Sequence, residues 1–134
     1  MPSRILIADD DPTIRMLLRR LVNAHAGWEV CGEAGTGADA VEKAAALVPD
    51  LVILDLAMPS MNGMQAAQEI AKACPSTLML LVSVQEVSRQ LAEAARKVGF
   101  RGAVTKGSGT EVVRGIEALF HSQTFFAIDD SLSA

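Results

Sequence analysis

The sequence predicts an α/β fold in which helices cover both faces of a parallel sheet. Residues 4–8, 51–54 and 77–82 form short, almost wholly apolar runs, which are typical of strands buried on both faces. Segments with the 3.6-residue periodicity of amphipathic helices lie between them. Strand and helix patterns alternate five times along the chain, and this alternation predicts a doubly wound sheet with right-handed crossovers.

Length and composition indicate one soluble, cytoplasmic domain. The chain has 134 residues, half of them apolar, and a net charge of −4, which argues against a strongly basic nucleic-acid surface. No apolar run approaches the ~20 residues that span a bilayer, and no signal-peptide pattern is present, so we expect no membrane partner. Cys31 and Cys74 lack metal-ligand spacing, and we expect two reduced, buried thiols.

In the first half of the chain, the strand at residues 4–8 runs into three carboxylates, residues 9–11. Asp11 precedes Pro12, a pattern that predicts a helix N-cap followed by a proline in the first turn. Residues 28–34 alternate between apolar and polar and suit a half-exposed edge strand. A second helix is expected over residues 37–48, where Pro49 ends it.

The second half repeats the strand and helix pattern three times. Helices are expected at residues 62–73, 85–98 and 110–121, and strands at 51–54, 77–82 and 102–105. Residues 122–134 are not periodic, although Phe125 and Phe126 need some cover from solvent. We therefore assign residues 1–121 to the domain and residues 122–134 to a tail or a linker towards a further domain.

Polar side chains follow four of the expected strands. They are Asp9 and Asp10, Asp55, Ser83 and Lys106. A doubly wound sheet brings the carboxyl ends of its strands to one edge, where ligands bind. Clustered carboxylates repel one another, and oxygen ligands of this kind suit Mg²⁺. A carboxylate that the metal leaves free can accept a phosphoryl group, which a lysine and a hydroxyl can hold. Taken singly, each residue also fits a helix cap, a turn or a solvated charge.

In the order and spacing of these residues, residues 3–121 resemble the receiver domain of bacterial two-component response regulators. The matching features are the Asp9-Asp10 pair, Asp55 in DLAMPSMNG (the family pattern D-x-x-M-P-x-x-x-G), Ser83, and Lys106 followed by glycine. Ser83 and Lys106 follow Asp55 by 28 and 51 residues, as in the family. The resemblance implies a flavodoxin-like sheet with strand order 2-1-3-4-5.

The resemblance also implies a role for each residue. Asp55 would accept a phosphoryl group from the phosphohistidine of a sensor histidine kinase. Ser83 would hydrogen-bond the phosphoryl oxygens, and Lys106 would pair with Asp55 before phosphorylation and with the phosphoryl group afterwards. Mg²⁺ would be held by the carboxylates of Asp9, Asp10 and Asp55 and by the carbonyl of Ala57. Such a domain is a phosphoacceptor and not a dedicated enzyme, because short loops leave no room for a substrate-binding cap.

Two positions depart from the family pattern. Ala103 stands where an aromatic residue usually moves inward after phosphorylation, and Val84 stands where a smaller residue follows the serine or threonine. We therefore expect slower gain or loss of the phosphoryl group, or a signal carried by backbone movement of residues 84–90 alone. The usual partner surface is the fourth helix, fifth strand and fifth helix. Its mixed charges suit either a symmetric homodimer or a solvated surface.

The tail, HSQTFFAIDDSLSA, is similar to the linker after receivers of NarL/LuxR-type regulators. This similarity predicts the N-terminal module of a transcription regulator, which would contact DNA only through an output domain outside these residues. Two alternatives remain open. One is a stand-alone receiver that acts by protein–protein interaction, and the other is a receiver-like module that is not phosphorylated.

Overall fold

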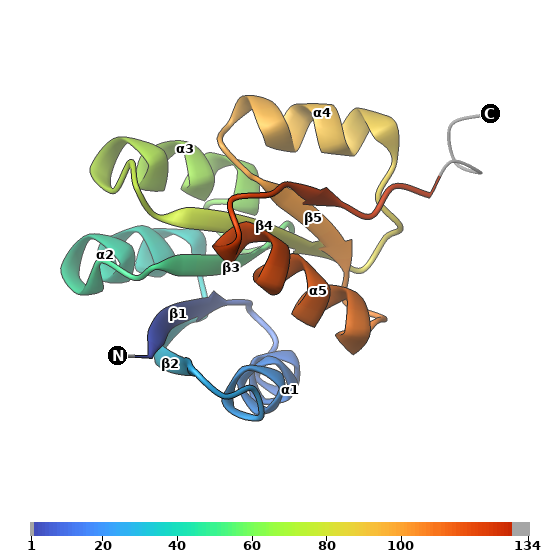
Figure 1. Cartoon of the computed structure of the whole chain (residues 1–134). Coiled ribbons are helices and arrows are strands. Elements are labelled where there is room, and N and C mark those ends of the chain that lie inside the picture. Colours follow the sequence, from blue (N-terminus) through green and yellow to red (C-terminus); the bar gives the residue numbers. More distant parts are fainter. Residues whose placement is uncertain (1, 130–134) are drawn as a thin grey trace.

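The computed structural model describes residues 2–129, and within them strands and helices alternate along the chain (Figure 1). The elements are β1 (Ser3–Ala8), α1 (Pro12–Asn23), β2 (Trp28–Ala34), α2 (Gly37–Leu47), β3 (Leu51–Asp55), α3 (Gly63–Ala73), β4 (Leu78–Ser83), α4 (Arg89–Lys97), β5 (Gly102–Thr105), α5 (Gly109–Phe120) and β6 (Phe125–Phe126). The strands form one parallel sheet in the order β2-β1-β3-β4-β5-β6. The predicted order 2-1-3-4-5 is confirmed, and β6 extends it.

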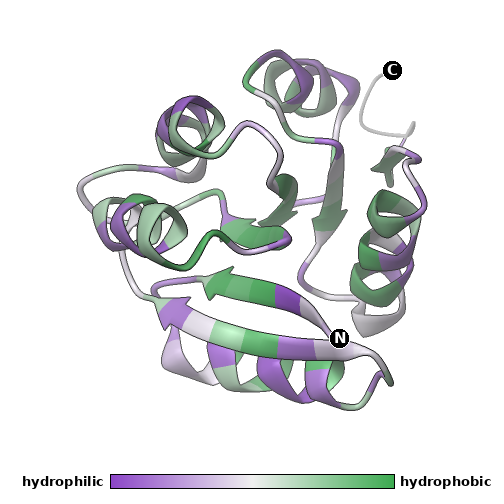
Figure 2. Ribbon diagram, turned by 60° about the vertical axis from the view of Figure 1, so that its left-hand side comes forward, coloured by the Kyte–Doolittle hydropathy of each residue, from purple (hydrophilic) through white to green (hydrophobic). Residues whose placement is uncertain are grey.

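The central strands separate two apolar cores, one on each face of the sheet. Along β1, Leu6 and Ala8 face α2, α3 and α4, whereas Ile5 and Ile7 face α1 and α5. β3 and β4 divide their side chains in the same way. Because successive strand residues point to opposite faces, a strand covered on both sides must be apolar throughout. Figure 2 shows the result, with hydrophobic strands inside and hydrophilic residues on the outer faces of the helices.

Each helix begins at a side chain that caps its first turn. Asp11 accepts a hydrogen bond from the backbone N–H of Thr13, 2.9 Å away, so its predicted role as the cap of α1 is confirmed. The other helices are capped in the same way by Thr36, Asn62, Ser88 and Ser108. Such caps satisfy backbone donors that have no partner within the helix.

The start of α4 differs from the prediction. The helix was expected from residue 85, but it begins at Arg89, and residues 84–88 form a loop. Ser88 is the cap, since its Oγ accepts from the N–H of Leu91. Val87 is fully buried, and its backbone forms a β-bridge with Ile128 of the tail instead of the first turn of a helix.

The tail also contains a strand that the sequence pattern did not predict. β6 lies beside β5 and covers what would otherwise be an open sheet edge. Residues 130–134 of the expected linker lie outside the described residues.

Cys74 is buried as expected, but Cys31, on the edge strand β2, is only half-buried. Among the helices of residues 2–129, none combines the length and the apolar character needed to cross a membrane.

Candidate functional site

The predicted polar residues meet at the carboxyl edge of the sheet. A pocket of about 420 Å³ opens there, and its lining includes Asp10, Asp55, Ala57, Ser83, Val84 and Lys106. Asp9 is fully buried and reaches this group through Lys106. β1, β3, β4 and β5 therefore each place at least one of these side chains at the same point, as the topology requires.

Lys106 joins two buried carboxylates. Its Nζ lies 2.7 Å from Oδ2 of Asp9 and 3.0 Å from Oδ1 of Asp55. Asp9 is 0% exposed and Asp55 is 2% exposed, so each carboxylate needs a cation to offset the cost of losing water. The sequence led us to expect only the pairing with Asp55. The contact with Asp9 shows that one ammonium group serves both carboxylates.

Burial shifts the protonation of this pair. Burial raises the pKa of Asp55, the hydrogen bond from Lys106 opposes the rise, and the nearby charge of Asp9 adds to it. Burial by itself would lower the pKa of Lys106, but the hydrogen bonds and charges of Asp9 and Asp55 outweigh it and raise that pKa. Lys106 is therefore charged at neutral pH, whereas ionised Asp55 is held at a free-energy cost that a further cation would reduce.

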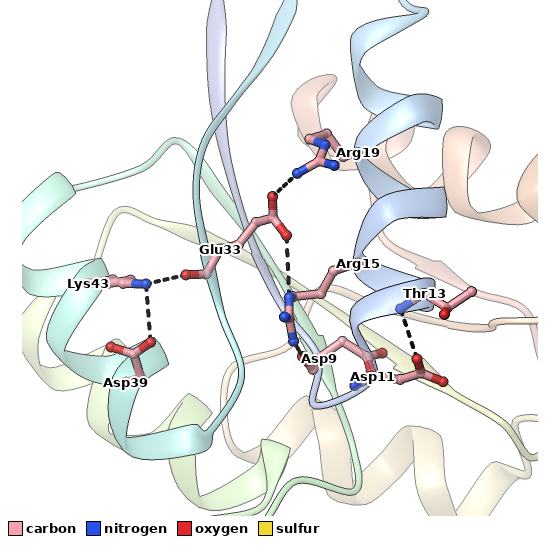
Figure 3. Close-up of polar contacts among 8 residues, drawn as sticks. All are labelled: Asp9, Asp11, Thr13, Arg15, Arg19, Glu33, Asp39 and Lys43. Atoms are coloured by element: carbon pink, nitrogen blue, oxygen red, sulfur yellow. Dashed lines mark hydrogen bonds and ion pairs between the residues drawn. The ribbon is translucent and has the colours of Figure 1, made fainter.

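A network of charged side chains fixes the turn after β1 (Figure 3). The Oδ1 of Asp9 accepts from the N–H of Asp11 at 2.9 Å, and its carbonyl accepts from Nη1 of Arg15 at 2.6 Å. The Nε of Arg15 lies 3.3 Å from Oε1 of Glu33 on β2, and Arg19 binds the other oxygen of Glu33. α1 and β2 thus hold the backbone that presents Asp9 and Asp10.

The network continues to α2, where Lys43 donates to the carbonyl of Glu33 and pairs with Asp39 (Figure 3). Arg15 was not among the site residues that the sequence predicted. The available signal was its position four residues after the capping Asp11, which turns it back over the end of β1. Glu33 had no comparable signal, because it is distant in sequence.

Gly63 lets α3 start against the end of β3. A Cβ at this position would lie 2.3 Å from the carbonyl oxygen of Asp55, closer than any real contact allows. The N–H of Gly63 donates to the carbonyl of Leu56 at 2.9 Å. The glycine of the D-x-x-M-P-x-x-x-G pattern is thus needed for close approach of the two backbones.

Ser83 ends β4 beside Lys106. It is 2% exposed, its Oγ accepts from the N–H of Gln85 at 3.1 Å, and its carbonyl accepts from the N–H of Lys106 at 2.8 Å. A hydroxyl that accepts one hydrogen bond still has a proton to donate. The following Val84 is 77% exposed on the pocket wall, whereas Ala103 is fully buried.

The acidic residues fit a hard divalent cation. Asp9, Asp10 and Asp55 each offer a carboxylate oxygen within 4.8 Å of the others. Asp10 is exposed and can approach an ion from solvent. A few carboxylates with room for waters are the environment that Mg²⁺ prefers. Asp11 is engaged at the cap of α1 instead.

This sheet, with an acidic pocket and a lysine at its carboxyl edge, defines a signalling domain of the response regulators. The chain belongs to the response regulator receiver domain family, whose sequence model matches residues 5–116. It is similar to the chemotaxis protein CheY of Thermotoga maritima, with 40% identity over 106 residues that cover 79% of this chain and 87% of that protein. PdtaR, a transcriptional regulatory protein of Mycobacterium tuberculosis, is 41% identical over 79% of this chain but only 50% of its own length.

Solved structures agree with this assignment. A LuxR-family response regulator from Aurantimonas sp. SI85-9A1 superposes with a TM-score of 0.89 at 29% identity, covering 95% of this chain and 91% of that one. The receiver domain of a NarL regulator from Mycobacterium tuberculosis gives 0.84 at 30% identity, over 91% of this chain and 98% of that one. The chain spans half or less of several curated relatives, for example 31% of a protein-glutamate methylesterase of Myxococcus xanthus.

Proposed function

We propose that this domain is a phosphorylation switch and that Asp55 is its phosphoacceptor. The observation that carries the proposal is the shared lysine, which holds two buried carboxylates at the edge of a pocket containing a third. Asp55 ends a central strand and lines that pocket. One of its oxygens would attack the phosphorus of a kinase phosphohistidine. A P–O bond forms, the donor P–N bond breaks, and the leaving imidazole takes a proton from solvent.

The other residues would position and neutralise the phosphoryl group. Lys106 would turn its ammonium towards the new oxygens, and Ser83 would donate its free hydroxyl proton to one of them. Asp9, Asp10 and Asp55, with the carbonyl of Ala57, would hold Mg²⁺. When bound, this ion supplies positive charge against the charge that develops on the phosphoryl oxygens.

Val84 would narrow access to the phosphorylated Asp55. Its side chain is 77% exposed and lines the same pocket as Asp55 and Lys106. Val84→Ala widens this opening, so we expect the phosphoryl group to be lost several times faster. Decay of the phosphorylated protein, followed by intact mass, measures this rate. An unchanged lifetime would show that Val84 does not limit access.

We further propose that residues 1–121 are the receiver module and that residues 122–134 lead towards an output domain that binds DNA. The partial coverage of PdtaR and the fit to a LuxR-family regulator support this reading. The second candidate is a stand-alone receiver in the cytoplasm that acts by protein–protein contact, and the 87% coverage of CheY favours it. In either case the face formed by α4, β5 and α5 is the proposed surface for a partner or for a homodimer.

Intact mass tests the phosphoacceptor proposal directly. The protein is incubated with acetyl phosphate and Mg²⁺, beside Asp55→Asn and Asp10→Asn. Asp50→Asn is the matched control, because Asp50 precedes the same strand at its opposite end, where it accepts from the N–H of Arg4. We expect one added phosphoryl group in the parent and in the control, none in Asp55→Asn, and slower uptake in Asp10→Asn. No mass gain in the parent, under conditions that modify a known receiver, would favour a phosphorylation-independent module.

A further inference from the structure

The segment after α5 folds back and binds to the edge of the sheet. β6 runs parallel to β5, and Figure 1 shows it passing along β5 on the way to the C-terminus. The N–H of Phe125 donates to the carbonyl of Arg101, and that of Ala127 donates to the carbonyl of Ala103, both at 3.0 Å. Main-chain bonds of this type are how an extended segment adds to an exposed sheet edge.

The same segment is also bound to the loop that follows Ser83. Ile128 forms a β-bridge with Val87, and the N–H of Asp129 donates to the carbonyl of Val87 at 2.8 Å. Val87 is fully buried, although the three residues before it, 84–86, are exposed. The tail therefore holds Val87, the buried residue of the loop 84–88, and Val84 at the other end of this loop lines the pocket.

Side chains complete the attachment. The guanidinium of Arg96 on α4 lies 4.4 Å above the centre of the Phe126 ring. Phe126 and Ile128 are partly buried against the core that contains Ala103 and Val87. Apolar burial and a cation–π contact thus add to the main-chain bonds that hold this five-residue segment.

We propose that the β5 edge, the 84–88 loop and α4 form a strand-binding surface for the chain's own residues 125–129, and that phosphorylation of Asp55 releases them. We call residues 125–129 the strap. Release rests on the proposed phosphorylation, whereas binding of the strap does not.

The coupling runs through the three residues between Ser83 and Val87. A phosphoryl group brings close to two negative charges and three acceptor oxygens into the pocket. If the Oγ of Ser83 moves towards them to donate its free proton, the N–H of Gln85, which is bonded to the same Oγ, must follow it or lose this bond. Because only residues 84–86 separate Ser83 from Val87, movement of the loop displaces the carbonyl of Val87. This carbonyl accepts the hydrogen bond from the N–H of Asp129 in the strap. Because coupling between two binding events is reciprocal, loss of the strap should also favour phosphorylation.

Amide hydrogen exchange and intact mass, measured on the same sample, test the release. The full chain is compared before and after treatment with acetyl phosphate and Mg²⁺. We expect the amides of Ala127 and Asp129 to exchange at least tenfold faster in the phosphorylated protein. The amide of Gln123 bonds the carbonyl of Ala118 at the end of α5, so it should not change and serves as the internal control. A phosphorylated sample with unchanged strap amides would overturn the proposal.

A pair of variants tests binding of the strap without phosphorylation. Arg96→Ala removes the contact with Phe126, and Lys97→Ala removes the same charge from the next, exposed position of α4. Loss of a cation–π contact of this kind should make the amide of Ala127 exchange about threefold faster. We expect this change in Arg96→Ala and not in Lys97→Ala. Equal exchange of the Ala127 amide in both variants would contradict the proposal that Arg96 helps to bind the strap. If the parent protein gains no mass, the phosphoacceptor proposal and the release both fail, while this pair still decides whether the strap binds as described.

Discussion

The two sides of the pocket are held by different kinds of contact. On the β1 side, side chains of α1 and β2 fix Asp9, whose carbonyl is bound by Arg15, itself paired with Glu33. On the β4 side, Ser83 is followed by three exposed residues, and the loop is next held at Val87, by main-chain contacts with the tail. We call these the fixed side and the adjustable side.

The difference matches what each side has to do. A metal site needs carboxylates held in one geometry, which a network of charged side chains supplies. A switch needs an element with two arrangements of similar free energy. Main-chain bonds at a sheet edge can break and re-form without leaving a buried charge unpaired. Lys106 contacts both sides, since it binds Asp9 through its ammonium and Ser83 through its backbone N–H.

Loss of this shared lysine should have the largest effect. Lys106→Met leaves Asp9 and Asp55 buried without their cation, and breaking a buried pair costs about 3 kcal/mol. We expect the free energy of unfolding to fall by that amount in urea denaturation at pH 7 with EDTA. Lys97→Met, at an exposed position of α4, should change it by less than about 0.5 kcal/mol. Similar losses in the two variants would mean that the lysine does not stabilise the carboxylates.

Overpacking the adjustable side should cost less than this. Ala103 is fully buried beside Phe126 of the strap, and Ala103→Tyr inserts a ring where no space exists, which costs about 2 kcal/mol. Because the strap can lift, we expect faster amide exchange at Ala127 and an altered phosphoryl lifetime with an intact fold. Ala94→Tyr, on the exposed side of α4, is the control. Unfolding of the whole domain would show that the two sides are equally rigid.

Loosening the fixed side should affect metal binding as well as stability. Arg15→Ala frees the carbonyl of Asp9 and leaves Glu33 with fewer partners. Since both side chains are partly exposed, we expect a loss of only about 1 kcal/mol. The affinity for Mg²⁺, measured by calorimetry, should fall several-fold. Arg20→Ala, an exposed position on the same helix, should leave the affinity unchanged. Normal Mg²⁺ binding in Arg15→Ala would show that the charged network of the fixed side is not needed to hold the metal-binding carboxylates.

Neutralising Asp55 should stabilise the metal-free domain slightly. Burial raises the pKa of Asp55 above its unfolded value of 3.8, so ionisation of this group costs free energy only in the folded state. The cost is fully present above the folded pKa and disappears as the pH falls towards 3.8. Asp55→Asn should therefore be more stable than the parent in urea denaturation at pH 7 with EDTA, and the gain should shrink in acid. Asp50→Asn should show no such gain. A gain that grows on acidification would contradict the sign of this pKa shift.

Much of the fold and of the site was predictable because it follows from local pattern and topology. Apolar runs such as Leu51–Leu54 are needed wherever helices cover both faces of a strand, and Asp11 with Pro12 is sufficient to start a helix. Once five parallel strands are inferred, their carboxyl ends must meet. Asp55, Ser83 and Lys106 are therefore brought together by topology without any knowledge of their contacts.

The remaining features depended on contacts between distant parts of the chain. The sequence by itself determined the parallel sheet and the residues at its edge, because local patterns set the strands and helices and their alternation makes the strands parallel. The order of the strands was implied by the family resemblance. The tertiary structure decided that Lys106 also pairs with Asp9, that Arg15 reaches Glu33, and that α4 begins after Val87. It also decided that the tail forms β6. The physical reason is that the free energy of each of these contacts comes from a partner far away in sequence, which only the folded chain brings within reach.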